Sequence, residues 1–344
     1  MTTTPAGYVN SDMLIETQWL AERLQRRDIR IVDMGSREAY LRAHIQGALH
    51  PGAAEKANYI KDPDEPKYVM PKEKFEALMS SLGIGNESLV IAYDADGGHN
   101  AARLWWAMSY YGRPNCKLLN GGWNKWVLEK RPVSLDVPSY PRTTFTAIER
   151  PALIAYVDDI EKAIAAKEPL LLDVRSDAEW NGTETRGNKR SGRIPGAVHV
   201  EWKNFVTSDA QRTFKPASEL QQILWQAGVT PNKKVTTYCQ AGVRASHTAF
   251  VLKLLGYDEV AVYDASFSEW GNLDETPIEK DGKITTGKKQ KPAAKKSPRG
   301  TALKPARKAK KPARKATAQP KKVAKPAKAK RSKATPARRK KPKK

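Results

Sequence analysis

Short apolar runs alternate with segments of helical periodicity in the second half of the chain. Runs rich in Val, Leu and Ile predict strands at 170–173, 235–238 and 260–263. Between them, apolar residues recur every three or four positions, which predicts helices at 157–166, 217–227 and 243–255. Strands of this composition separated by helices are typical of an α/β fold with a parallel sheet covered on both faces. In such sheets ligands bind beyond the carboxyl ends of the strands.

The same order of motifs occurs twice. RIVD at 30–33 recurs as LLLD at 170–173, HIQGALH at 44–50 as RIPGAVH at 193–199, LVIAYD at 89–94 as KVTTYC at 234–239, and NGGWNKW at 120–126 as DASFSEW at 264–270. The offsets stay between 140 and 149 residues, which indicates two copies of one domain. We expect these domains at 12–135 and 152–280, joined by a Pro-containing linker at 136–151. The second copy has about nine extra residues, in the polar stretch 181–193.

Charge divides the chain into a body and a tail. Residues 283–344 carry 27 Lys and Arg and no Asp or Glu, which leaves 34 basic and 37 acidic residues in the preceding body. The two cysteines are far apart, which excludes a disulfide scaffold and a Cys-rich zinc site, and we expect no metal or cofactor. The first residues lack the features of a secretory signal, and no apolar run is long enough for a membrane span. We therefore expect a cytoplasmic protein with a free thiol at Cys239.

Cys239 lies where the fold places chemistry. It follows a predicted strand and opens a short loop before a predicted helix, with the sequence Cys239, Gln240, Ala241, Gly242, Val243 and Arg244. Backbone N–H groups of such a loop and the helix N-terminus form an anion-binding nest, and Gly242 eases the required backbone angles. A thiolate at this position is stabilised, and Arg244 adds a positive charge.

A buried structural role is the alternative for each cysteine. For Cys239 the position at a strand end, before a Gly-containing loop, favours the chemical role. Cys116 begins the apolar run 116–119, which favours a place in the core.

The motifs LLDVR, RIPGAVH, YCQAGVRASH and VYDASFSEW together resemble the tandem-domain rhodaneses, which are thiosulfate and 3-mercaptopyruvate sulfurtransferases. The resemblance covers most of residues 12–280. It implies a catalytic second domain in which Cys239 accepts a sulfane sulfur as a persulfide and passes it to cyanide or a thiol. It also implies a silent first domain, which has Asp94 at the matching position.

Other charged residues are candidates for supporting roles. Asp173 at a strand end can bind the loop or pair with Arg175, or instead cap the segment 176–180, and Asp264 can hold the loop from the next strand. His247 either faces the site or is a packed or solvated helix residue. The insertion offers possible donor-binding cations, which are equally consistent with solvated loop charges: Arg186, Lys189, Arg190 and Arg193.

The sequence leaves the donor and the reaction class partly open. Family loops with CRKGV are common in thiosulfate enzymes and those with CGSGV in mercaptopyruvate enzymes, whereas Gln240 and Ala241 match neither. The basic surroundings favour thiosulfate over mercaptopyruvate. A cysteine phosphatase is disfavoured because its loop has five residues between Cys and Arg, and this one has four. A degenerate binding module is disfavoured by the intact loop.

The tail predicts a separate property. Residues 283–344 consist mostly of Lys, Arg, Ala and Pro without aromatic residues, which predicts disorder and resembles linker-histone tails. Such a block favours non-specific binding of DNA or RNA, and hence association with the nucleoid, over a merely solubilising extension.

Overall fold

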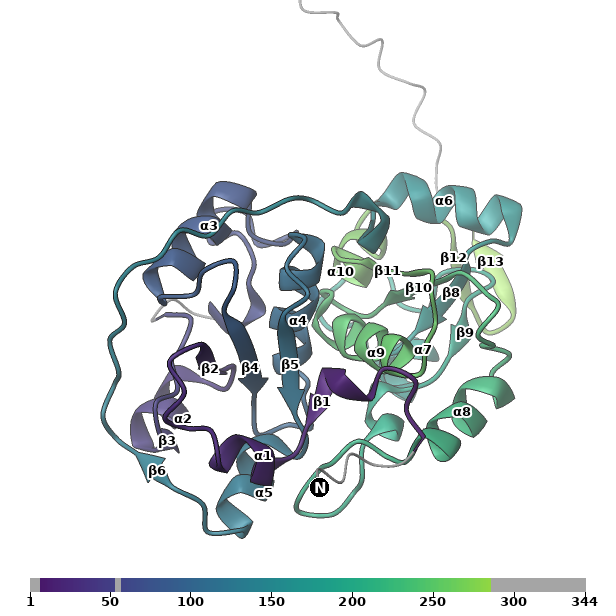
Figure 1. Cartoon of the computed structure of the whole chain (residues 1–344). Helices are drawn as coiled ribbons and strands as arrows, with labels where there is room; N and C mark the ends of the chain where they lie inside the picture. The colour runs from purple at the N-terminus through teal and green to yellow at the C-terminus, as the bar shows by residue number, and fades with distance from the viewer. Residues whose placement is uncertain (1–6, 53–56, 286–344) are drawn as a thin grey trace, which may run out of the picture. The chain divides into compact units, whose positions relative to one another are not determined.

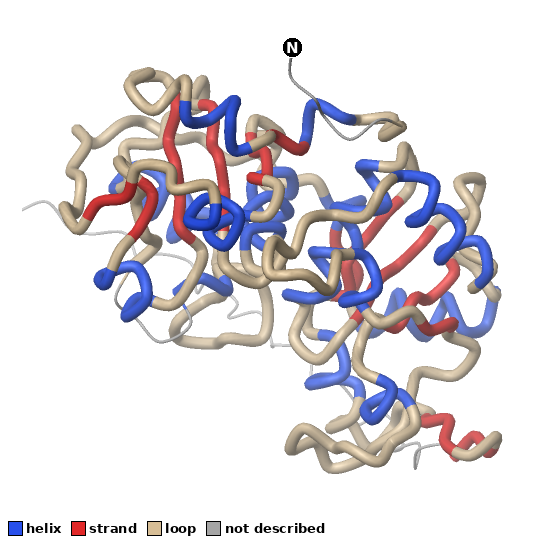
Figure 2. The backbone as a smooth tube through the Cα atoms, turned by 90° about the horizontal axis from the view of Figure 1, so that it is seen from below, coloured by secondary structure: helices blue, strands red, loops and turns tan. Residues whose placement is uncertain are grey.

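The computed structural model describes residues 7–52 and 57–285. Almost all of the basic segment 283–344 therefore lies outside the described residues, and the predictions of disorder and nucleic-acid binding rest on sequence. Figure 1 labels the elements along the chain, and Figure 2 shows the strands of each domain between helices.

The first domain is built on a four-stranded parallel sheet in the order β1-β5-β4-β2. Its strands are β1 (Leu14–Ile15), β2 (Ile29–Asp33), β4 (Leu89–Tyr93) and β5 (Cys116–Leu119). A small antiparallel sheet pairs β3 (His44–Ile45) with β6 (Val133–Ser134). The helices are α1 (Thr17–Ala21), α2 (Arg37–Arg42), α3 (Lys72–Ser81), α4 (Ala101–Tyr110) and α5 (Gly122–Leu128), with 3-10 turns η1 (Ser11–Met13) and η2 (Ala57–Tyr59).

The second domain repeats this plan with five parallel strands in the order β7-β11-β10-β8-β9. They are β7 (Ile154–Ala155), β8 (Leu170–Asp173), β9 (Val198–His199), β10 (Val235–Tyr238) and β11 (Val260–Tyr263). A hairpin pairs β12 (Ile278–Lys280) with β13 (Lys283–Thr285). The helices are α6 (Val157–Ala166), α7 (Asp177–Trp180), α8 (Ala217–Gln226), α9 (Val243–Leu254) and α10 (Ser266–Trp270), with 3-10 turns η3 (Pro151–Leu153) and η4 (Trp202–Phe205).

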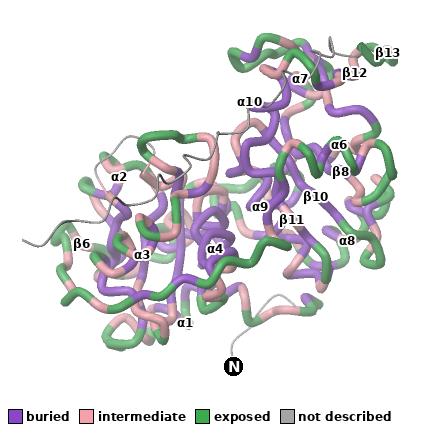
Figure 3. Tube along the Cα trace, turned by 90° about the horizontal axis from the view of Figure 1, so that it is seen from above, coloured by how far each residue is buried: buried purple, intermediate pink, exposed green. Residues whose placement is uncertain are grey.

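Both faces of each sheet are buried, as the uninterrupted apolar runs predict. In β4, Val90 and Ala92 pack into one core, whereas Ile91 and Tyr93 pack into another on the opposite face. This follows from the two-residue period of side chains along a strand. Figure 3 shows the central strands and helices α4 and α9 in the colour of buried residues. The predicted α/β fold with two similar domains is confirmed.

Helices α4 and α9 join the two domains into one core. They pack against each other, and Trp105 of α4 meets Phe250 of α9 edge-on, with ring centroids 5.1 Å apart. Both helices are apolar or buried on nearly every face. A helix that is buried all round needs neighbours on every side, so each domain completes the other's core.

The local expectations agree closely with the structure in the second domain. The three predicted strands and the helix at 157–166 have the expected bounds, and the other two helices each end one residue earlier. One boundary differs, because residues 283–285, assigned to the tail from their composition, form β13 and pair with β12. The linker 136–151 is held on the first domain, where Phe145 is buried against Phe75.

Candidate active site

The carboxyl ends of three neighbouring strands bring the candidate residues of the second domain together. Tyr238, the last residue of β10, lies opposite Asp173, the last residue of β8. Cys239 follows Tyr238 directly, and Asp264 follows the end of adjacent β11. Residues distant in sequence therefore meet at the position where parallel sheets place their ligands.

The Cys239 loop turns a backbone donor towards the sulfur. The N–H of Gly242 points to Cys239 Sγ, with an N–S distance of 3.1 Å. Gly242 has a φ of +82° and precedes the first residue of α9. A Cβ atom at this residue would lie 2.2 Å from Asp264 Oδ1, so only glycine fits between the loop and the end of β11. The sulfur is thus held at a helix N-terminus, where an anion is stabilised.

Hydrogen bonds to the segment that follows β11 hold this loop in place. Ser266 Oγ accepts a hydrogen bond from the Cys239 N–H at 3.1 Å. In return, Phe267 N donates to the Cys239 carbonyl at 3.0 Å, and Ser268 N donates to the Gln240 carbonyl at 2.8 Å. Ser266 adopts a φ of +53°, which is uncommon for a residue with a side chain. These bonds fix the backbone on both sides of the sulfur.

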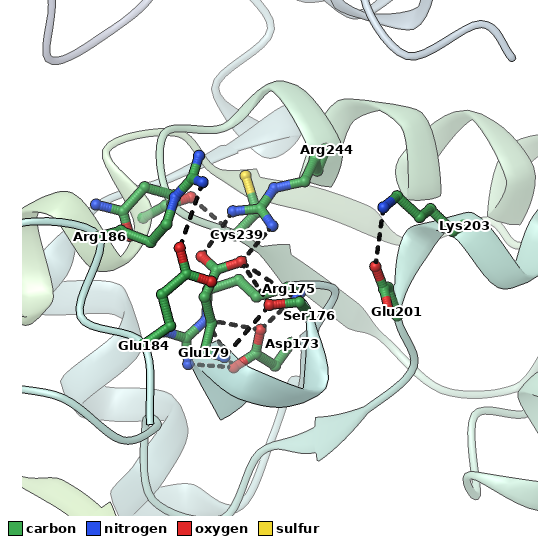
Figure 4. Close-up of polar contacts among 12 residues, drawn as sticks. Asp173, Arg175, Ser176, Glu179, Glu184, Arg186, Glu201, Lys203, Cys239 and Arg244 are labelled. Carbon is green, nitrogen blue, oxygen red and sulfur yellow. Dashed lines mark hydrogen bonds and ion pairs between the residues drawn. The ribbon is translucent and has the colours of Figure 1, made fainter. Parts of the chain in front are cut away.

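Arg244 is paired with a carboxylate that the sequence analysis missed. Its Nη1 and Nη2 donate to the two oxygens of Glu179 at 2.6 and 2.8 Å, a bidentate ion pair. Figure 4 shows the pair together with Cys239. Burial alone would raise the pKa of Glu179, but the hydrogen bonds and charge of Arg244 lower it to about 2. Arg244 therefore brings its charge to the loop with a counter-charge already bound.

Asp173 pairs with Arg175. Asp173 Oδ2 accepts from Arg175 Nη2 at 2.6 Å, and Oδ1 accepts from both the backbone N–H and Nε of Arg175. The alternative of a helix cap is wrong, because Ser176 caps α7 with its own hydroxyl and forms a capping box with Glu179. Both groups of the ion pair are buried, so the pair supports the site as a neutral unit.

Gln240 is engaged by the insertion of the second domain. Its amide exchanges two hydrogen bonds with the amide of Asn188, at 3.1 and 3.0 Å. Asn272 also donates to Asn188 Oδ1, which ties the insertion to the end of α10. Val243 is buried at the start of α9, and Ala241 is partly exposed. The insertion therefore fixes the first side chain after Cys239.

The cations proposed for donor binding differ in their freedom. Arg190 donates to the carbonyls of Trp270 and Thr276 at 3.0 and 2.6 Å, and Arg193 pairs with Glu279 at 2.5 Å. Arg186 stands 3.5 Å from Glu184 and its side chain is 52% exposed. Lys189 is also exposed, 3.9 Å from Asp274. The contacts of Arg190 and Arg193 stabilise the insertion, whereas Arg186 and Lys189 can still turn to a ligand.

Asp264 receives two cations from the first domain. Arg103 of α4 binds it with two hydrogen bonds, at 2.6 and 3.2 Å, and Lys61 Nζ stands 3.4 Å from Oδ1. All three side chains are buried. Burial would raise the pKa of Asp264, but Arg103 and Lys61 lower it below its ordinary value. No hydrogen bond joins this carboxylate to the Cys239 loop among the described contacts, so Asp264 supports the loop by packing against Gly242.

The matching loop of the first domain holds its own anion. The carboxylate of Asp94 accepts four backbone hydrogen bonds of 2.7 to 3.0 Å, from the N–H groups of Asp96, Gly98, Asn100 and Ala101. This nest at the start of α4 is thus filled by a covalently attached carboxylate. A carboxylate cannot carry a sulfane sulfur, so this copy lacks the nucleophile.

Two other candidate groups lie in the core. Cys116 is buried within β5, and burial raises the pKa of its thiol far above the ordinary range. His247 is fully buried in α9, where burial lowers its pKa to about 3 and its ring stacks on Phe214. Neither group is suited to nucleophilic or proton-transfer chemistry at neutral pH.

Several residues of the site had little or no signal in the sequence. Glu179 forms an S-x-x-E capping box with Ser176, a pattern that predicts a helix start and not an ion pair with Arg244. Ser266 has no signal beyond its place in the repeat. Arg103 and Lys61 belong to the first domain and reach the site only through tertiary packing.

No group of three or more His, Cys, Asp or Glu is arranged to hold a metal ion in residues 7–52 and 57–285. Within the same residues, every helix is too short or too polar to cross a membrane.

Comparison with known proteins agrees with this geometry. The rhodanese-like domain family matches residues 16–129 and 156–273, one match in each domain. The sulfur carrier protein TtuD of Thermus thermophilus is 37% identical over 289 residues, covering 80% of this chain and 99% of TtuD. A thiosulfate sulfurtransferase of Corynebacterium glutamicum is 31% identical over 292 residues, covering 79% of this chain and 92% of that protein.

The solved structures include SseA from Escherichia coli, a 3-mercaptopyruvate enzyme. It superposes with a TM-score of 0.66 at 25% identity, covering 74% of this chain and 98% of SseA. The fold, the position of Cys239 and these matches define the class of protein. The chain belongs to the rhodanese family, and it is a sulfurtransferase with two rhodanese-like domains in tandem.

Proposed function

We propose that the chain transfers a sulfane sulfur from thiosulfate, through a persulfide on Cys239, to cyanide or a thiol. The observation that carries this proposal is the short contact between the Gly242 N–H and Cys239 Sγ, at the N-terminus of α9. A helix N-terminus and an inward N–H stabilise a thiolate and then a persulfide anion. The geometry needs no general base, because both forms of the sulfur are anionic.

The two half-reactions balance without a redox partner. The Cys239 thiolate attacks the outer sulfur of thiosulfate, the S–S bond of the donor breaks, and sulfite leaves with the bonding electron pair. The acceptor then attacks the outer sulfur of the persulfide, and the thiolate of Cys239 leaves. Cyanide becomes thiocyanate, and a thiolate becomes a persulfide.

One relative and two exposed cations favour thiosulfate as the donor. The Corynebacterium relative is a thiosulfate enzyme, and Arg186 and Lys189 offer exposed cations for a dianion. The bound partners of Arg190, Arg193 and Arg244 reduce the positive charge that the sequence suggested. 3-Mercaptopyruvate is therefore the alternative donor, in keeping with the structural similarity to SseA.

Replacement of each cysteine tests the carrier. Cys239→Ser should abolish sulfur transfer and the mass gain of one sulfur after incubation with donor, whereas Cys116→Ser should keep both. Rates with thiosulfate and 3-mercaptopyruvate, measured side by side, decide between the donors. Sulfur transfer retained by Cys239→Ser would overturn the proposal. Phosphate release from an aryl phosphate without persulfide formation would assign the loop to phosphatase chemistry instead.

For residues 286–344 we propose non-specific binding of nucleic acid, with association with the nucleoid as its consequence. The support is the charge of the basic segment, which has no acidic residue and no aromatic residue to stack on bases. Binding should weaken steeply with salt, with a slope of about −0.9 for each duplex phosphate neutralised. A chain ending at Thr285 keeps β13 and should retain sulfur transfer while losing DNA retention. Equal DNA binding by the shortened chain would place the binding surface in the body.

A further inference from the structure

Within the described part of the chain, the charges around Cys239 form pairs with one cation left over. Arg244 is paired with Glu179, Arg175 with Asp173, and, on α10, Glu269 with Lys67. The remaining carboxylate, Asp264, faces both Arg103 and Lys61. With a neutral thiol at Cys239, this buried group carries one excess positive charge.

A short chain of contacts links that excess charge to the sulfur. Gly242, whose N–H points to Cys239 Sγ, packs so closely on Asp264 that an added Cβ would be 2.2 Å from Oδ1. The same oxygen faces Nη1 of Arg103 at 2.6 Å and Nζ of Lys61 at 3.4 Å. The ammonium group of Lys61 and the Gly242 end of the loop therefore lie against the same carboxylate.

Arg103 and Lys61 hold different positions in this cluster. Arg103 uses both terminal nitrogens on Asp264 and its Nε on the Tyr59 carbonyl, which makes it the direct partner of the carboxylate. Lys61 donates a 2.6 Å bond to the Lys67 carbonyl and only long contacts to Asp264. Among the described residues, Arg103 thus neutralises the carboxylate, and Lys61 shares it without a carboxylate of its own.

We propose that Lys61, from the domain without a catalytic cysteine, supplies the charge that balances the anionic thiolate and persulfide of Cys239. Ionised Cys239 and Asp264 then match Arg103 and Lys61, and the buried cluster is neutral. Lys61 does not contact the sulfur. It is a positioning residue, which acts through the electrostatic potential that its charge produces at Cys239. The inference rests on the proposed function, because a persulfide carrier needs this anion in every turnover.

The titration of Lys61 is consistent with this role. Burial lowers the pKa of Lys61 to about 8, with Asp264 and the Cys239 thiolate acting in the opposite direction. The ammonium is therefore charged at neutral pH and loses its proton as the pH rises through about 8. The other groups facing the cluster from α4, α7 and α9 are paired, or, as with His247, held neutral by burial.

Alkylation of Cys239 by iodoacetamide as a function of pH tests the inference in a Cys116→Ser background. Lys61→Met should raise the pH midpoint of alkylation by roughly one unit, the effect expected for removing one nearby charge. Lys74→Met is the matched control, because Lys74 pairs with Asp62 at the surface, and its midpoint should equal the parent's. Lys61→Arg keeps the charge and should restore the parent midpoint. A folded Lys61→Met protein with the parent midpoint would overturn the inference.

If the Lys61→Met protein fails to fold, a second measurement on the parent and Lys61→Arg tests the inference. The alkaline loss of kcat/KM should begin near pH 8 in the parent and move to higher pH in Lys61→Arg, because a guanidinium keeps its proton. An unchanged alkaline limb would refute the role of Lys61. Alkylation needs no sulfur donor, so failure of sulfur transfer would count against the proposed function and leave the Lys61 test valid.

Discussion

Ser266 has a left-handed backbone conformation, and the matching residue of the first domain, Gly122, has the same conformation. Gly122, 144 residues earlier, has a φ of +49°, and a Cβ there would lie 2.1 Å from the Asp94 carbonyl oxygen. Ser266 keeps the left-handed conformation with a side chain and uses its hydroxyl as acceptor for the Cys239 N–H. Such strain persists where surrounding contacts hold it, and here it places a hydrogen-bond acceptor against the Cys239 loop.

Substitution of Ser266 should separate the hydrogen bond from the strain. Ser266→Ala keeps the left-handed strain and leaves the buried Cys239 N–H without its acceptor, so it should lower the free energy of unfolding by roughly 1–3 kcal/mol. Ser266→Gly loses the same bond but relieves about 1 kcal/mol of strain. The free energy of unfolding in urea should therefore be highest for the parent, lower for Ser266→Gly and lowest for Ser266→Ala. An alanine variant as stable as the parent would contradict this account.

The ion pair of Glu179 and Arg244 should make the free energy of unfolding depend on pH in the acidic range. The pKa of Glu179 is lowered from 4.5 to about 2, so folding favours the ionised form. This contribution, about 3 kcal/mol, is fully present above pH 4.5 and is lost as the pH falls towards 2. Glu179→Gln should be less stable at pH 7 and should show a flatter fall between pH 5 and 3 in urea unfolding. Glu184→Gln, at an exposed pair, is the control and should follow the parent curve.

At the scale of elements, the two domains use one loop position in two ways. The loop between β4 and α4 closes around the Asp94 carboxylate, whereas the loop between β10 and α9 is three residues shorter and presents Cys239. Each places its side chain, a carboxylate or a thiol, at the N-terminus of the following helix, where an anion is stabilised. The loop between β4 and α4 therefore has an electrostatic arrangement similar to that of the Cys239 loop. Its acidic group, the Asp94 carboxylate, has a structural role.

Removal of the Asp94 carboxylate should destabilise the chain without removing its nucleophile. Asp94→Ala leaves four backbone donors without their acceptor, and we expect a loss of roughly 3 kcal/mol or more in the free energy of unfolding. Asp96→Ala is the control in the same loop. Its carboxylate forms an exposed ion pair with Arg212, so the loss should stay under about 1 kcal/mol. Sulfur transfer per folded molecule should persist in both, and equal stability of the two variants would argue against the nest.

At the scale of the whole body, the first domain completes the core of the second and supplies two cations to its buried Asp264. Helix α9 carries Cys239's loop at its start and packs on α4 along its length. Arg103 of α4 reaches Asp264 with both terminal nitrogens. The first domain therefore packs against the helix that carries the Cys239 loop.

The second domain should not fold alone. A fragment of residues 152–285 exposes the buried face of α9. It also leaves the Asp264 carboxylate without its cationic partners, and a charge without its ion-pair partners destabilises the fold. We expect aggregation or a non-cooperative state in size-exclusion chromatography and near-UV circular dichroism. The chain ending at Thr285 should instead unfold in one cooperative transition. A monomeric fragment with a cooperative transition of its own would show that the two cores are independent.

Much of the fold was predictable because its signals are local. The strands and helices of the second domain follow from apolar runs and helical periodicity, and the duplication follows from four motif pairs at similar spacing. The position of Cys239 between a strand and a helix was also visible in the sequence. The extent of β13 was not, because Lys283–Thr285 has the composition of the tail and gains its structure from pairing with β12.

The sequence by itself determined the class of fold, the two copies, the position of Cys239 after a strand and the absence of a cysteine at Asp94, since each depends on residue type and spacing along the chain. Tertiary structure alone decided which charges are paired. Arg244 pairs with Glu179, 65 residues away, and Lys61 lies 203 residues from the carboxylate it faces. The physical reason is that Coulomb interactions act through space and strengthen on burial. Neither the distance nor the burial of two charges is encoded at either position alone.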